Sequence, residues 1–112
     1  MSLHKVCKVD DIKEESMILV CVDKREVIIA KHKGKIISFD PFCPHRYAYL
    51  HRGWFNDNNI VCPLHKFEFD LDTGKLVKIP DEYKEQREAW KASGDLKFYY
   101  CVIKDGCVYI KI

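Results

Sequence analysis

The chain has 112 residues, with 19 Lys and Arg against 17 Asp and Glu and a formal net charge of +2. This length is typical of one domain and is too short for a core plus a separate catalytic domain. The charges are balanced and dispersed, which gives no reason to expect a nucleic-acid partner. We therefore expect a single small domain over residues 1–112.

The predicted elements of the first forty residues are β-strands. Apolar runs of strand length cover 4–9, 17–22, 26–32 and 35–39, with a turn at 10–12. Lys33-Gly34 lies between the last two runs and predicts a hairpin. Charged and apolar residues alternate around it, as expected for a half-buried antiparallel sheet.

The middle of the chain predicts two loops separated by short extended pieces. The first loop covers about 40–52 and the second about 60–67, and both contain Cys, His and Pro. The segment 52–59 reads as a tight turn because of its Gly and its run of Asn and Asp. Alternation resumes over 67–71 and 75–79 and ends at Pro80.

One short helix is expected over 81–94, after an acidic start and before Gly94. A final hairpin, 98–103 with 107–112, is predicted around Asp105-Gly106. The fold class is therefore all-β, with one short helical insertion and two loops that carry the Cys and His residues.

The Cys and His residues of these loops have metal-ligand spacing. The motifs are Cys43-Pro44-His45 and Cys62-Pro63-Leu64-His65, with sixteen residues between His45 and Cys62. Zinc accepts such a Cys₂His₂ set, although its commoner spacings pair Cys with Cys and His with His. A Rieske cluster has two thiolates on one iron and two imidazoles on the other. One Cys and one His from each of two opposed loops match that arrangement.

The pattern resembles the Rieske ferredoxin family, which includes ferredoxins of ring-hydroxylating dioxygenases and nitrite reductase small subunits. The resemblance rests on both motifs and on Arg46, Leu50, Gly53-Trp54 and the sequence Phe-Asp-Leu-Asp-Thr-Gly at 69–74. It implies an antiparallel β-sandwich and one [2Fe–2S] cluster. It also implies that Cys43 and Cys62 bind the inner iron, and His45 and His65 the outer iron.

The function implied by the resemblance is that of a soluble one-electron carrier between a flavoprotein reductase and a terminal oxygenase or similar oxidoreductase. Two alternatives stay open: a small subunit of a nitrite-reductase-like complex, and a zinc-bound structural module. The chain is not expected to be an enzyme by itself. A Rieske oxygenase needs a second iron that is bound by two His and a carboxylate, and this chain is too short to contain that domain.

Four positions indicate which subtype of Rieske protein the chain resembles. High-potential Rieske proteins carry two extra cysteines where this chain has Ala48 and Leu64, and hydrogen-bond donors where it has Phe67 and Phe69. Fewer hydrogen bonds to the cluster stabilise its reduced state less. We predict a disulfide-free protein with a reduction potential near the low end of the Rieske range, about −150 mV.

Some residues depart from the family pattern. Tyr47 and Lys66 stand where the family often has Gly, and 81–95 has no counterpart. Tyr47, Tyr49 and Leu64 are candidates for an exposed apolar collar at which a partner docks.

The remaining Cys, His and Trp residues have structural interpretations. Trp54 and Phe55 are expected in the core, His4 and His32 on the surface, and His51 as a polar loop residue. The cysteines outside the motifs read as small buried hydrophobes; they are Cys7, Cys21, Cys101 and Cys107.

No apolar stretch reaches the about 20 residues that span a membrane. The first residues lack the apolar core of a signal peptide, so the expected location is the cytoplasm.

Overall fold

The computed structural model describes residues 3–43, 49–63, 66–80 and 95–112, and within them the fold is all-β, as the sequence predicts. The helix expected over 81–94 lies outside the described residues. The strands are β1 (Leu3–Lys8), β2 (Ser16–Val22), β3 (Arg25–His32), β4 (Lys35–Phe39), β5 (Trp54–Asn56), β6 (Asn59–Val61), β7 (Glu68–Asp70), β8 (Leu76–Lys78), β9 (Phe98–Tyr99), β10 (Cys101–Lys104) and β11 (Cys107–Lys111). Short 3₁₀ turns cover η1 (Val9–Asp11) and η2 (Leu50–Arg52).

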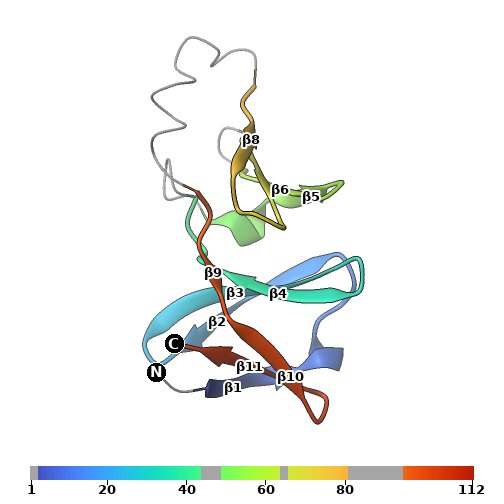
Figure 1. Cartoon of the computed structure of the whole chain (residues 1–112), viewed down its shortest axis with the longest axis vertical. Helices are drawn as coiled ribbons and strands as arrows, with labels where there is room; N and C mark the ends of the chain where they lie inside the picture. The colour runs from blue at the N-terminus through green and yellow to red at the C-terminus, as the bar shows by residue number, and fades with distance from the viewer. Residues whose placement is uncertain (1–2, 44–48, 64–65, 81–94) are drawn as a thin grey trace. The chain divides into compact units, whose positions relative to one another are not determined.

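The strands form three antiparallel sheets, and Figure 1 labels their strands apart from β7. Their orders are β1-β11-β10, β2-β3-β4-β9 and β5-β6-β7-β8. The chain divides into two compact units. The first unit joins Met1–Asp40 to Phe98–Ile112, and the second is Pro41–Lys97.

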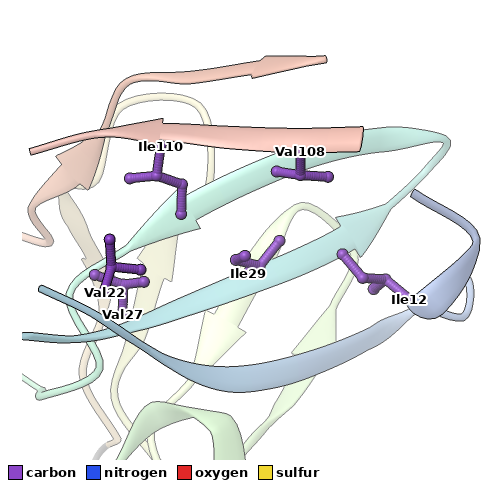
Figure 2. Close-up of a cluster of buried hydrophobic side chains, with 6 residues drawn as sticks. All are labelled: Ile12, Val22, Val27, Ile29, Val108 and Ile110. Atoms are coloured by element: carbon purple, nitrogen blue, oxygen red, sulfur yellow. The ribbon is translucent and has the colours of Figure 1, made fainter. Parts of the chain in front are cut away.

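The first unit is a two-sheet sandwich around an aliphatic core. Figure 2 shows Val108 and Ile110 of β11 facing Ile29 of β3, with Ile12 beyond the end of the sheet. Val22 and Val27 complete this cluster, and all six side chains are nearly inaccessible to solvent. In β3, four consecutive residues starting at Val27 are fully buried. Such a continuous apolar run is typical of a strand that is covered on both faces.

Three two-residue turns set the register of the first unit. Both central residues of each turn have positive φ, as type I′ hairpins require. The turns are Asp23-Lys24, Lys33-Gly34 and Asp105-Gly106. The last two confirm the predicted hairpins.

The second unit contains the meander β5-β6-β7-β8 (Figure 1, green to yellow). The tight turn predicted over 52–59 is shorter than expected. Strands β5 and β6 pair within this range, and the turn itself consists of Asp57-Asn58. Cross-strand neighbours share a face of the sheet. Phe55, Ile60 and Phe69 therefore form one face, and Trp54, Val61 and Glu68 form the other.

Three structural interpretations from the sequence are wrong. Trp54 is 46% exposed rather than in the core, and Cys21 is exposed. His32 is buried rather than at the surface, because the turn that contains Glu15 folds over the end of β3. The Nδ1 atom of His32 lies 2.5 Å from Oε2 of Glu15.

Candidate metal centre

The first predicted loop is closed at its base immediately before and after the undescribed residues 44–48. Phe42 and Tyr49 form an isolated antiparallel bridge, and their ring centroids lie 4.8 Å apart. The amide of Leu50 donates a hydrogen bond to the carbonyl of Pro41 at 2.7 Å. Cys43 follows this closure, and its side chain is fully buried. The thiol therefore lies at the base of the loop, shielded from water.

The second predicted loop begins at Cys62 itself. The amide of Cys62 donates to the carbonyl of Phe67 at 2.8 Å, and its carbonyl accepts from the amide of Lys66 at 2.9 Å. Cys62 is also fully buried. These two backbone bonds close the loop around the undescribed residues 64–65.

The bases of the two loops are held together by the pairing of β5 with β6. Trp54 pairs with Val61, the residue before Cys62. Gly53 lies so close to this strand that an added Cβ would stand 1.9 Å from the carbonyl oxygen of Val61. Gly53 follows η2, whose Leu50 closes the first loop. The sheet therefore brings the Cys43 loop and the Cys62 loop side by side.

His45 and His65 lie outside the described residues, so the four-ligand set stays a prediction. Within the described ranges, no group of three or more His, Cys, Asp and Glu residues could hold a metal ion.

The described residues fit an iron–sulfur centre in their donor chemistry. Two buried thiols on adjacent loops supply the soft ligands that such a cluster requires. Phe67 and Phe69 are fully or almost fully buried beside the second loop. Their rings offer no hydrogen-bond donor.

Tyr49, the collar candidate that lies among the described residues, is half-buried. The ring of Tyr49 packs on Phe42 and also on His51, at 5.3 Å between centroids. His51 is half-buried on η2, and its Nδ1 atom has no hydrogen-bond partner in the part of the chain that the structure describes. Tyr47 and Leu64, the other collar candidates, fall among the undescribed residues.

Lys66 has φ 59°, in the left-handed region that favours glycine. This explains the Gly that the resembling family often has there. Lys66 keeps the turn at the cost of some backbone strain, and its side chain is exposed beside the second loop.

The sequence analysis missed a polar cluster around one buried carboxylate in the second unit. Glu68 is 5% exposed and accepts hydrogen bonds from the side-chain amides of Asn56 and Asn59. The sequence did contain a hint of this cluster. Glu68 stands between two apolar residues, Phe67 and Phe69, and Asn56 and Asn59 lie on neighbouring strands.

The cysteines outside the motifs lie in the first unit and form no disulfide. Three of them, on β1, β10 and β11, are half-buried rather than fully buried. Burial and, to a smaller extent, the neighbouring Cys7 raise the pKa of the Cys101 thiol to about 11. Burial also raises the pKa of Cys7, with smaller contributions from Asp11 and Cys107. The raised pKa values make the thiols of Cys7 and Cys101 poor nucleophiles.

Among the described residues, no helix has the length and apolar character needed to cross a membrane.

Comparison with known proteins gives a family match over most of the chain. Residues 2–99 match the model of the Rieske [2Fe-2S] domain. The chain is 31% identical over 113 residues to the 3-phenylpropionate/cinnamic acid dioxygenase ferredoxin subunit of Photorhabdus laumondii, which covers 100% of this chain and 96% of that protein.

Two further proteins are similar. The ferredoxin component of the alkene monooxygenase system of Xanthobacter autotrophicus is 31% identical over 73 residues, which span 64% of this chain and only 60% of that protein. The solved structure of the Sphingomonas yanoikuyae B1 ferredoxin has a TM-score of 0.80 at 25% identity, over 99% of each chain.

Proposed function

Because this chain belongs to the Rieske [2Fe-2S] domain family, we propose that it is a one-electron carrier that delivers electrons to an oxygenase. The observation that supports this most is the pair of buried thiols, Cys43 and Cys62, on loops that the sheet holds together. The relatives described above are named as ferredoxin components of oxygenase systems. We further propose a flavoprotein reductase as the electron donor and the cytoplasm as the location.

The bound cluster supplies the site's redox chemistry, which is the gain and loss of one electron. The protein's part is to bind and to exclude water. Cys43 and Cys62 hold the inner iron, and His45 and His65 hold the outer iron. The two closed loop bases fix both thiols, and the fully buried Phe67 lies beside the second loop.

The low-potential subtype belongs to the same proposal. Phe67 and Phe69 offer no side-chain donor, and Ala48 and Leu64 exclude the bridging disulfide. We propose a potential near the low end of the Rieske range, about −150 mV. The free thiols of Cys7, Cys21, Cys101 and Cys107 support a reducing compartment.

Iron and zinc analysis of the purified protein, with visible absorption and electron paramagnetic resonance of the reduced form, tests the proposal. We expect two irons per chain and a Rieske signal. Cys43→Ser and Cys62→Ser are expected to abolish assembly of the cluster, whereas Cys21→Ser, at an exposed position, leaves it intact. A colourless protein with one zinc and no iron would instead establish the structural module.

A further inference from the structure

Glu68 of β7 is a buried carboxylate, although buried strand positions are usually occupied by apolar residues. Its exposed fraction is 5%, and it faces the same side of the sheet as Val61 and Trp54. Removing a carboxylate from water is costly unless hydrogen bonds or opposite charges offset the loss of hydration. The hydrogen-bond and ion-pair partners of Glu68 therefore have to offset that loss.

Those partners are two amide donors and one ammonium group. The side-chain amides of Asn56 and Asn59 donate to its Oε1 atom at 3.2 and 3.1 Å. The Nζ atom of Lys78 lies 3.6 Å from its Oε2 atom. The side chain of Lys78 is 63% exposed and that of Glu68 only 7%, so water screens the ammonium far more than the carboxylate. The protein interior therefore feels a net negative charge.

Glu68 is also fixed relative to Cys62. It pairs with Val61, the residue directly before Cys62. Its neighbour Phe67 accepts the hydrogen bond from the amide of Cys62. Since both links are backbone links within one sheet, the carboxylate and the thiol keep a constant separation.

From this arrangement we propose that Glu68 is a built-in negative charge that lowers the reduction potential of the cluster bound through Cys62. The inference rests on the proposed function. Reduction adds one electron, supplied by the reducing partner, to a site that is joined through one sheet to a buried negative charge, whose side chain lies on the sheet face opposite Phe69. Coulomb repulsion is strong where the dielectric constant is low, so the reduced state is destabilised relative to the oxidised state.

Glu68→Gln tests the proposal because it removes the charge and keeps the size of the side chain and one acceptor oxygen for the two Asn amides. We expect the midpoint potential of the holoprotein, measured by mediated titration, to shift upward. We expect the cluster's absorption and resonance spectra to stay unchanged. The shift is expected to persist at high salt, because a buried charge is poorly screened.

Asp70→Asn is the matched control on the same strand. Asp70 pairs with Asn59, farther along the sheet from Cys62, and it is only half-buried. Its carboxylate already accepts hydrogen bonds from Asn58 and from the amide of Asp72. We expect a clearly smaller shift in potential for this variant.

Lys78→Gln is a second variant, at an exposed position where folding is not in question. It leaves Glu68 without its counter-charge, so the potential is expected to fall. Equal potentials in wild type and Glu68→Gln would overturn the proposal, as would an equal shift in Asp70→Asn or no change in Lys78→Gln. Failure of the proposed function is seen separately, as wild-type protein that lacks the [2Fe–2S] spectra.

Discussion

Gly53 occupies a position where a single methyl group has no room. In Gly53→Ala, the new Cβ would stand 1.9 Å from the carbonyl oxygen of Val61 and 3.2 Å from that of Leu50. Both obstacles are backbone atoms, so the strand that leads to Cys62 must shift. We expect a loss of about 2 kcal/mol or more in the free energy of unfolding, together with reduced iron content, by chemical denaturation and metal analysis.

Gly106→Ala separates this steric effect from general strain. Gly106 has φ +75° but no atom within 4 Å of an added Cβ. Its substitution is expected to cost about 1–2 kcal/mol from the left-handed backbone alone, with full iron content. If both variants kept their iron equally well, the close approach of Gly53 would not position the second loop.

The thiols of the first unit are expected to react in a defined order. Cys21 is exposed, whereas burial and the neighbouring Cys7 raise the pKa of Cys101 to about 11. The thiolate is the form that iodoacetamide alkylates. Below about pH 11, Cys21 should therefore be labelled long before Cys101, as measured by mass spectrometry of digested protein.

The raised pKa of Cys101 also makes the stability of the folded protein depend on pH. A thiol whose pKa is raised on folding holds its proton more tightly in the folded state. Its contribution is complete below the ordinary value of 9.0 and declines as the pH rises toward about 11. Cys101→Val should remove this part of the alkaline destabilisation. Equal labelling rates for Cys21 and Cys101 at pH 9.0 would contradict the assignment.

Individual residues were predictable where chemistry restricts them. Cys43 and Cys62 stand in a ligand motif, and both are completely buried; their role as ligands stays a prediction. The misassigned residues are those whose environment depends on the tertiary structure. Trp54 belongs to the sheet face that also carries Glu68, and His32 is covered by a turn far away in sequence. Neither fact is visible in local patterning.

Elements were predictable where turn chemistry and alternation agree. Lys33-Gly34 and Asp105-Gly106 identify two hairpins because glycine accepts positive φ. The Asp23-Lys24 turn has the same geometry but contains no glycine. Its position could be inferred only from the predicted strands on either side of it. Strand β5 was missed because it is short and lies between Gly53 and the polar turn at Asp57-Asn58.

The strand β7 provides a test of the low-potential subtype. Phe69→Tyr adds a hydroxyl donor at the position where high-potential members of the resembling family carry one. We expect the midpoint potential to rise, because a donor stabilises the more negative reduced state. Mediated titration of the holoprotein measures it.

Phe55→Tyr is the matched control for this substitution, since Phe55 lies on the same sheet face, on β5. It should leave the potential unchanged. A shift of equal size in both variants would show that added polarity, rather than a directed donor, sets the potential.

At the scale of the whole molecule, the predicted cluster ligands and the aliphatic core shown in Figure 2 belong to different units. The aliphatic core of Val27, Ile29, Val108 and their neighbours lies wholly within the first unit. Both predicted Cys ligands, Cys43 and Cys62, lie in the second unit. Metal binding stabilises mainly the segments that it ties together.

Cluster removal should therefore loosen residues 41–97 more than the first unit. Hydrogen exchange of the holoprotein and of Cys43→Ser, followed by mass spectrometry, measures this difference. We expect faster exchange in β5–β8 and near-native protection in β3 and β11. Equal loss of protection in both units would show that they unfold as one.

The pairing of β4 with β9 has a consequence for protein engineering. Ser38 faces Tyr99 and Phe39 faces Phe98, so the segment 41–97 departs from and returns to neighbouring strands. Its two ends are held as close as the ends of a hairpin loop, which makes the whole segment a cassette. Exchanging it for a short turn would leave a bare sandwich scaffold. Grafting it between paired strands of an unrelated protein would offer a way to install a redox centre there.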